Sequence, residues 1–263
     1  MDRVTTTDRR TALRAGAGLV AGGALAAGCA TTGPAAAPAT PARAPAAKAT
    51  PLTAPAPAPR AFSRQPPQIT HGPRDRPRIA LTFHGQGDPG IATAILTEAE
   101  KHGARVTVLA VGTWLDTHPE MARRILDGGH DLGNHTQRHI AVNTLSEADA
   151  LAEITGCADR LKRLTGSIGT WFRPSRAPAA SPLVQRLAHR VGYPHVLSYD
   201  VDSLDFTEPG APAVTRKVLS EVRDGSVVSM HFGYAGTVAA LPAVLQELDR
   251  RGLRAVTTTE LLS

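Results

Sequence analysis

Short apolar runs alternate with segments of helical periodicity from about residue 76 to the C-terminus. The apolar runs predict strands at 78–83, 105–112, 131–135, 169–174, 195–201, 226–232 and 254–259. The segments between them predict helices near 90–102, 117–128, 146–165, 181–192, 212–223 and 237–251. Several strands are apolar throughout, which is typical of parallel strands buried on both faces, so the alternation implies right-handed βαβ units.

The number of predicted strands limits the choice of α/β fold. Seven strands are too few for a full eight-stranded barrel. We therefore expect either an incomplete, distorted (β/α)7 barrel or an open doubly wound sheet. In both folds the chemistry gathers at the C-terminal ends of the parallel strands.

The N-terminal region has a different pattern. Residues 1–29 contain a twin arginine, Arg9-Arg10, and then a charge-free run of small apolar residues that ends at Cys29. This segment resembles a twin-arginine export signal, and "LAAGC" resembles a lipobox, in which Cys29 would be lipidated. Residues 30–75, rich in Ala and Pro, predict a disordered linker, and residues 76–263 predict the folded domain. We expect a lipoprotein on the outer face of the cell membrane or, alternatively, a secreted protein.

The net charge of +6 suggests nucleic-acid binding until it is divided along the chain. Residues 1–76 hold 10 Lys and Arg against 3 Asp and Glu, so the remaining residues carry a net charge of −1. The basic excess belongs to the leader and the linker. We therefore predict no nucleic-acid partner for the folded domain.

Polar residues of chemically useful types follow five of the predicted strands. They are His84 and Asp88, His135 and His139, Arg173, Asp205, and His231. The spacing of "HTQRH" would place its two imidazoles on one face of a helical turn, which suits a zinc-like ion. Taken alone, such a pair is more often solvated on a helix surface than bound to a metal.

Four segments together resemble the polysaccharide deacetylase family, the NodB-homology carbohydrate esterases of family 4. "GHDLGNHTQRH" is similar to the second family motif, which implies that His135 and His139 bind a metal. "WFRPSRAP" resembles the third motif, whose arginine, here Arg173, orients the catalytic base. "YDVDSLDF" and "GSVVSMHFG" resemble the fourth and fifth, so Asp205 would pair with His231, the general acid.

The first family motif is altered in this chain. The family pattern is "TFDDG", in which the first Asp is the general base and the second is a metal ligand, whereas this chain has "TFHGQGD". His84 stands in place of the base and Gly85 in place of the ligand. In one interpretation the site is rebuilt, so that His84 or Asp88 is the third ligand and the other acts as base. In a second the metal site is lost or weak, and in a third both residues are structural, with Asp88 capping the helix that begins at Pro89.

The resemblance implies a metal-dependent hydrolase that removes acetyl groups from an envelope or extracellular glycan. Its cofactor would be one divalent ion, with zinc the expected metal, and its partner an acetylated glycan. The lipid anchor would be the only membrane contact, and we expect a monomer. The alternative is a non-catalytic, glycan-binding lipoprotein with a degenerate metal site.

Overall fold

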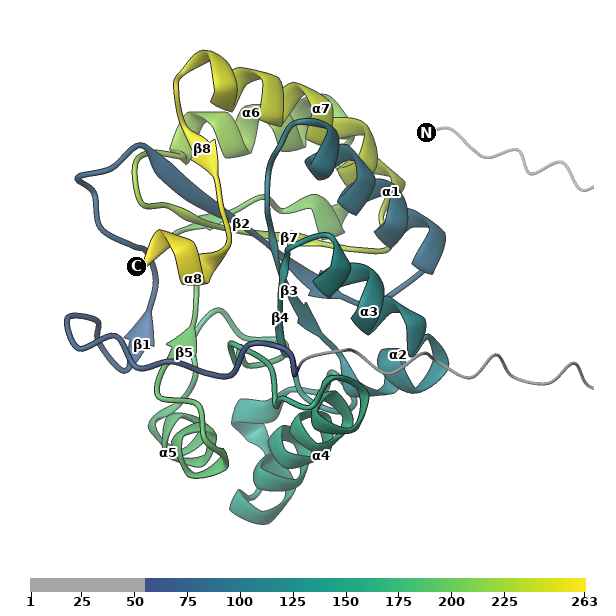
Figure 1. Ribbon diagram of the computed structural model, residues 1–263, viewed down its shortest axis with the longest axis vertical. Coiled ribbons are helices and arrows are strands. Elements are labelled where there is room, and N and C mark those ends of the chain that lie inside the picture. The colour runs from purple at the N-terminus through teal and green to yellow at the C-terminus, as the bar shows by residue number, and fades with distance from the viewer. Residues whose placement is uncertain (1–54) are drawn as a thin grey trace, which may run out of the picture. The chain divides into compact units, whose positions relative to one another are not determined.

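The computed structural model describes residues 55–263 (Figure 1). The predicted export signal, the lipidation site Cys29 and the first part of the linker lie outside these described residues. Within residues 55–263, none of the helices combines the length and the apolar character needed to cross a membrane.

Parallel strands form the centre of the domain. Their bounds are β1 Gln68–Ile69, β2 Arg78–Gly85, β3 Thr107–Ala110, β4 Asp131–Asn134, β5 Val196–Leu197, β6 Val201–Asp202, β7 Val227–His231 and β8 Arg254–Ala255. The order in the main sheet is β4-β3-β2-β7-β6, and β8 pairs with β2. Phe172 bridges Asn134 on one side and Val196 on the other, so a single residue links β4 to β5. The sheet thus curls into the expected distorted barrel.

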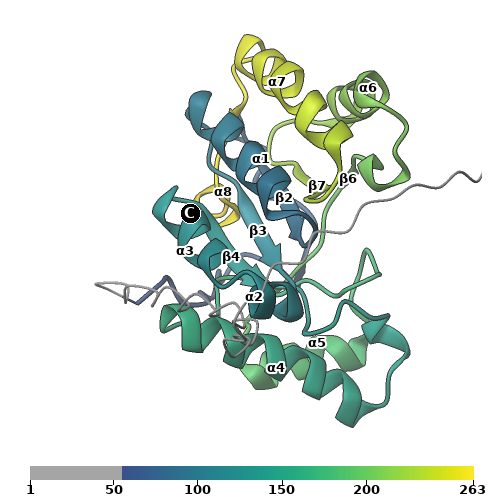
Figure 2. The same cartoon turned by 90° about the vertical axis from the view of Figure 1, so that its right-hand side faces the viewer.

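Helices surround these strands. Their bounds are α1 Pro89–Lys101, α2 Gly112–Thr117, α3 Glu120–Asp127, α4 Glu147–Thr165, α5 Pro182–Val191, α6 Ala211–Glu221, α7 Ala235–Arg250 and α8 Thr258–Leu261, with 3-10 turns at Val142–Thr144 and Asp205–Thr207. Helices α6 and α7 pack together at one end of the strand layer, and α4 and α5 pack together at the other (Figures 1 and 2).

Several predicted elements differ from the observed ones. The strand predicted at 169–174 is reduced to the bridge residue Phe172, and the strand at 195–201 is broken into β5 and β6. The helix predicted at 117–128 corresponds to α3, and an additional short helix, α2, precedes it and is separated from it by Pro119. Proline lacks the N–H that a continuous helix would need at this point. The strand predicted at 254–259 is limited to β8, and helix α8 follows it. Thr257 and Glu260 form a capping box at the N-terminus of α8.

Strand β2 divides its side chains between two environments. Leu81 and Phe83 belong to the apolar core that contains residues of helices α1 and α7, while Ala80 belongs to a second core inside the barrel. The alternation of strand side chains places Thr82 and His84 on the inner face with Ala80. The same alternation directs position 85 away from the barrel interior.

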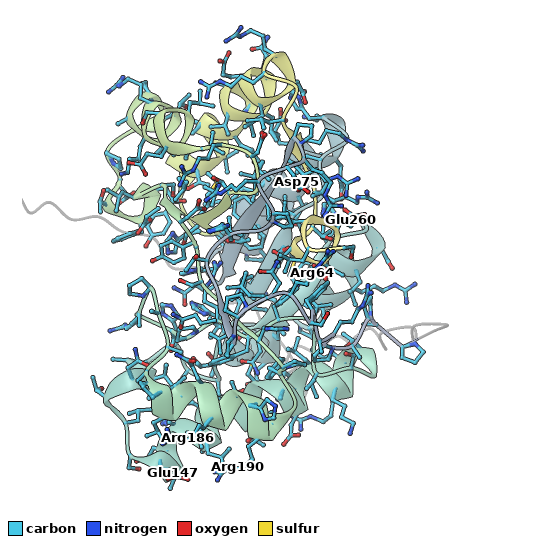
Figure 3. The ribbon with its side chains drawn as sticks, turned by 90° about the vertical axis from the view of Figure 1, so that its left-hand side faces the viewer. Arg64, Asp75, Glu147, Arg186, Arg190 and Glu260 are labelled. Carbon is cyan, nitrogen blue, oxygen red and sulfur yellow. The ribbon has the colours of Figure 1, made fainter. Side chains whose placement is uncertain are left out.

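The predicted boundary at residue 76 is wrong, because residues 55–75 pack against the domain. The Ala56 N–H donates to the Thr165 carbonyl over 2.9 Å, and β1 pairs with β5. The Phe62 ring stacks on Trp171, with centroids 5.6 Å apart. Figure 3 shows Arg64 and Asp75 of this segment on the same face as Glu260 of α8. The segment therefore covers the interior core at the end of the barrel where the strands begin.

Candidate active site and metal centre

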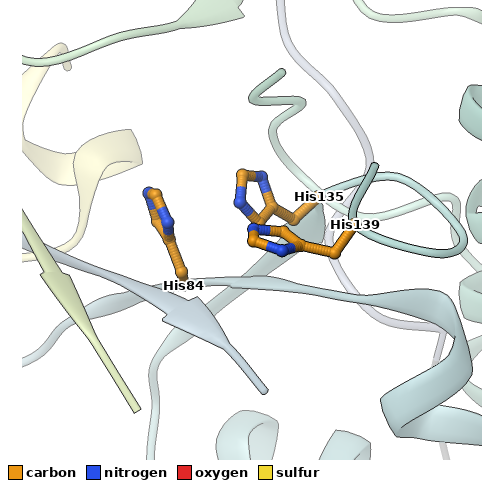
Figure 4. A group of neighbouring side chains, drawn as sticks. All are labelled: His84, His135 and His139. Atoms are coloured by element: carbon orange, nitrogen blue, oxygen red, sulfur yellow. The ribbon is translucent and has the colours of Figure 1, made fainter. Parts of the chain in front are cut away.

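Four histidines meet at the C-terminal ends of the central strands. His84 ends the inner face of β2 and lies in register with His231 of β7. The ring centroid of His84 is 4.2 Å from that of His135 and 4.2 Å from that of His231. His139 joins the group through His135, with centroids 4.9 Å apart. Figure 4 shows His84 on one side of the group and the other two labelled imidazoles facing it.

The loop that carries His135 and His139 is not a helix, so the helical spacing predicted for "HTQRH" is wrong. Its backbone takes positive φ values of 69° at Thr136 and 56° at His139, a conformation that is uncommon for residues other than glycine. Hydrogen bonds fix this shape. The Asn134 side chain accepts from the Thr136 N–H over 2.8 Å, and the Glu153 carboxylate accepts from the Arg138 N–H over 2.8 Å. The irregular loop, rather than a helix face, brings the two imidazoles together.

Three of the four histidines have the arrangement of metal ligands. The potential ligand atoms of His84, His135 and His139 lie within 4.8 Å of one another. The Nε2 atoms of His135 and His139 are buried and have no hydrogen-bond partner. His135 Nδ1 lies 3.0 Å from the Arg173 carbonyl, which can only accept, so Nδ1 carries the proton and Nε2 offers its lone pair. This is how metal-ligating histidines are oriented in proteins, and the three residues therefore fit a divalent ion.

The environment keeps these imidazoles neutral, the form that binds a metal. Burial, and then the neighbouring His135 and His231, lower the pKa of His84 well below its usual value. Burial and then His139 lower the pKa of His135 in the same way. The pKa of His139 falls to about 4, through burial and then the charge of Arg176.

Asp88 lies outside this group and caps helix α1. Its Oδ1 accepts from the Gly90 N–H over 2.6 Å and from the Ile91 N–H over 3.2 Å. Of the two first-loop candidates for the third ligand, His84 is therefore the one that the structure brings to His135 and His139. The glycines expected to fold the loop back serve another purpose: a Cβ at Gly87, where φ is 99°, would lie 2.6 Å from the Gly233 Cα. This close approach joins the loops after β2 and β7.

Arg173 lies under the histidines as a fully buried cation. Its guanidinium donates to the Leu197 carbonyl, the Thr82 hydroxyl and the Ser198 carbonyl, over 3.2, 2.9 and 2.9 Å. Burial lowers its pKa to about 10. In place of the carboxylate base expected beside this arginine, the chain has His84, so Arg173 binds barrel carbonyls and a hydroxyl.

His231 and Asp205 form the pair that the fourth and fifth motifs imply. His231 Nδ1 lies 2.7 Å from Asp205 Oδ1, and Asp205 Oδ2 accepts from the backbone N–H of His231 over 2.8 Å. The Thr237 hydroxyl donates to the same Oδ2 over 2.7 Å. Burial alone would raise the pKa of Asp205, but these hydrogen bonds outweigh it and lower the pKa below its usual value. The carboxylate thus holds the proton on Nδ1 and leaves Nε2 of His231 for a substrate.

Two further residues of the site, Thr237 and Ser175, were not predicted from the sequence. Thr237 has no motif around it, and only the approach of α7 to the Asp205–Thr207 turn reveals its contact. Ser175 is buried and joins the loop after Arg173 to the histidine loop, a contact that chain spacing does not encode. Phe206 is 43% exposed and lies 5.1 Å from His231 between ring centroids, so it forms an apolar rim at the opening.

Comparisons with known proteins agree with this geometry. Residues 71–196 match the sequence model of the family described as polysaccharide deacetylase. A peptidoglycan-N-acetylglucosamine deacetylase of Bacillus cereus is 29% identical over 194 residues, covering 72% of this chain and 90% of the relative. A peptidoglycan-N-acetylmuramic acid deacetylase of Bacillus subtilis is 26% identical over 183 residues, which are 70% of this chain but 38% of that relative.

Solved structures show the same fold. A peptidoglycan N-acetylglucosamine deacetylase matches with a TM-score of 0.69 at 25% identity, over 73% of this chain and 91% of that chain. A pseudoenzyme of carbohydrate esterase family 4 from Bacillus anthracis matches with a TM-score of 0.71 at 23% identity, over 76% of this chain and 70% of that chain. Residues 71–196 of this chain belong to the polysaccharide deacetylase family, with an altered first motif.

Proposed function

We propose that this protein is a metal-dependent deacetylase that hydrolyses acetyl groups on an envelope glycan of the peptidoglycan type. Its curated relatives from Bacillus cereus and Bacillus subtilis are named for that activity. The observation that supports the proposal is that a group of three histidines and the His231–Asp205 pair lie together at one end of the barrel. Three imidazoles whose possible ligand atoms converge lie beside a His231–Asp205 pair that is arranged for proton transfer.

In this proposal His84, His135 and His139 hold the ion, and His84 replaces the carboxylate ligand of the family pattern. Three imidazole nitrogens with an open fourth position are a normal donor set for catalytic zinc, so zinc is the metal we propose. When bound, such an ion polarises the acetyl carbonyl and makes water a stronger nucleophile at neutral pH. Asp88 serves the fold in this assignment, as the cap of α1.

The proton is moved by His231, because His84 is committed to the ion. The His231 Nε2 takes a proton from the attacking water while the water oxygen bonds to the acetyl carbon. The same nitrogen then returns the proton to the sugar nitrogen as the C–N bond breaks, which leaves acetate and a free amine. Asp205 fixes the ring by accepting from Nδ1, and Thr237 holds that carboxylate in place.

The alternative function is glycan binding without hydrolysis. The altered first motif favours it, because the position of the family's carboxylate base is occupied by His84 and the next residue is Gly85. In this alternative the histidines would still hold an ion, and the apolar rim at Phe206 would contact the glycan. A monomer, exported to the outer face of the membrane and anchored at Cys29, is compatible with both functions.

Acetate release from acetylated peptidoglycan distinguishes the two functions. We would compare the zinc-loaded protein with His231→Ala and with His189→Ala, a control that removes an exposed imidazole on α5. The deacetylase proposal predicts acetate release that His231→Ala abolishes and the control retains. Zinc binding and glycan binding without acetate release would replace it with the binding function.

A further inference from the structure

The chain enters the described domain beside the last turn of helix α4. The Ala56 N–H donates to the Thr165 carbonyl over 2.9 Å, and the Ser167 hydroxyl donates to the Pro57 carbonyl over 2.8 Å. The segment then crosses the end of the barrel where the strands begin, whereas the histidines lie where the strands end. The predicted lipidation site, Cys29, precedes this entry point in the sequence. A lipid at Cys29 would therefore be attached to the domain through the end opposite the candidate active site.

Four exposed cations lie at this end of the barrel. Lys162 and Arg163 are in the last turn of α4, and Arg60 and Arg64 are in the segment that covers the barrel end. The Arg60 guanidinium lies 5.5 Å from the centroid of the Phe62 ring, and Figure 3 labels Arg64 on the same covering segment. Among the ion pairs of residues 55–263, none includes any of these four side chains. These four residues form what we call the cationic surface.

Other cations at helix ends are neutralised by the protein itself. In the last turns of four helices, a Lys or Arg side chain lies 3.2 Å or less from a carboxylate: Lys101 from Glu98 on α1, Arg124 of α3 from Glu100, Arg190 of α5 from Glu147, and Arg250 from Glu247 on α7. Asp75 and Glu260, which Figure 3 shows on the face of the covering segment, pair with Arg76 and Arg105. Asp159 is the carboxylate in the preceding turn of α4, so it offsets at most one of the four charges. The cationic surface therefore keeps a net positive charge.

We propose that the cationic surface docks the domain on the anionic phospholipid headgroups of the cell membrane. Lys and Arg side chains at a membrane surface are attracted to anionic lipids, and this attraction acts within about one Debye length. A soluble polyanion would be attracted as well. A membrane is favoured because the chain that leads from Cys29 enters the domain at this same end, so a lipid there would raise the effective concentration of headgroups at the cationic surface.

Docking in this way orients the domain. The barrel end with the cationic surface faces the membrane, and the histidines at the other end face the envelope glycan. The domain then contacts the membrane itself, in addition to the lipid anchor expected from the sequence. The inference goes beyond the proposed function, and it depends on the predicted export but not on hydrolysis.

Vesicle co-sedimentation of the full-length chain tests the cationic surface. The vesicles contain phosphatidylglycerol and phosphatidylcholine in equal amounts, or phosphatidylcholine alone. Arg163→Gln should weaken binding to the anionic vesicles about fivefold, and Lys162→Gln/Arg163→Gln about 25-fold. Arg216→Gln, which removes an exposed arginine on α6, is the matched control and should bind like the wild type. All of these proteins carry the same leader, so its own attraction to the vesicles cancels in each ratio.

Each outcome supports or removes membrane docking. Equal binding of the wild type and the double variant, or equal binding of the wild type to both kinds of vesicle, would overturn it. Binding to inorganic polyphosphate that the double variant loses, without binding to vesicles, would assign the surface to a soluble polyanion instead. Absence of acetate release from every protein, together with vesicle binding that depends on Lys162 and Arg163, would remove the deacetylase proposal and leave membrane docking in place.

Discussion

The two sides of the site differ in how far the protein itself completes them. On one side, His231 and Asp205 satisfy each other, and Thr237 supports the carboxylate. On the other side, His135 and His139 have buried Nε2 atoms to which no group of the described residues is hydrogen-bonded. A buried polar atom without a partner costs free energy, so its persistence indicates a ligand. The proton-transfer pair is complete without a further group, whereas the histidine side is arranged so that a bound ion would complete it.

The largest effect that separates the two sides is expected from Asp205→Asn. The substitution keeps the shape but removes the charge that holds His231 in one tautomer, so acetate release should fall about 1000-fold. Zinc content should remain that of the wild type, because Asp205 is not among the three candidate ligands. Steady-state kinetics and metal analysis of the same sample check both statements. Loss of zinc in this variant would mean that the two sides are one unit.

Gly85→Asp tests whether the missing family carboxylate can be put back. A Cβ at position 85 would lie 2.9 Å from the Val108 Cγ1 and 3.0 Å from the Ala110 Cα, on the outer face of β2. The new carboxylate would enter an apolar core. We therefore expect the free energy of unfolding, measured by denaturant titration, to fall by about 3 kcal/mol or more. Gly236→Asp is the control, since nothing lies within 4 Å of a Cβ there. Unchanged stability with restored activity would contradict this geometry.

The histidine side predicts how stability depends on pH when zinc is removed by a chelator. The folded-state pKa values of His84 and His135 are well below their usual value, and that of His139 is about 4. As the pH falls below about 6.5, the unfolded chain takes up protons that the folded chain does not bind. Stability should therefore be flat above this pH and should fall below it, by about 1.4 kcal/mol per pH unit for each buried imidazole. Denaturant titrations between pH 4 and 8 measure this slope.

A variant with one histidine fewer provides the control for the pH experiment. His135→Ala should flatten the slope, and His189→Ala, which alters an exposed residue, should leave it unchanged. An equal slope in all three proteins would mean that these imidazoles are protonated in the folded state, contrary to the neutral cluster described above.

The smallest effect is expected at Asp88. Asp88→Ala removes the cap of α1 and should lower stability by about 1 kcal/mol, while Asp88→Asn should retain most of it. Neither variant should alter zinc content. Thermal denaturation and metal analysis test this, and a loss of zinc in both variants would return Asp88 to the list of ligands.

Much of the fold could be predicted from the sequence because it depends on local periodicity. The runs at β2, β3 and β7 are apolar enough to predict buried parallel strands, and their polar ends mark where the site lies. The packing of residues 55–75 could not be predicted, because their Ala and Pro content predicts an extended chain. Only the partners of that chain, such as Trp171 beneath Phe62 and the edge of β5, show that the segment belongs to the domain.

The sequence indicates which residues are candidates for the site, but it does not determine the role of each residue. The pairing of His231 with Asp205 followed from two motifs, and the structure contains it. The choice between His84 and Asp88 depends on whether the loop after His84 folds back toward the histidines, which the sequence leaves open. The geometry of β2 resolves the placement: it continues to Gly85 and directs His84 inward, while Asp88 is used by the first turn of α1. The different positions of His84 and Asp88 depend on how β2 pairs with its neighbouring strands, which the local sequence pattern does not encode.

The central claim is that His84 completes a three-histidine metal site. It is tested most directly by the zinc content of the purified protein and of His84→Ala, each loaded with excess zinc and then desalted. If His84 is the third ligand, the wild-type chain should hold about one zinc and His84→Ala almost none, with His189→Ala as the wild-type-like control. Full zinc occupancy in His84→Ala would contradict the account, because the ion would then be held without the histidine that replaces the family's carboxylate.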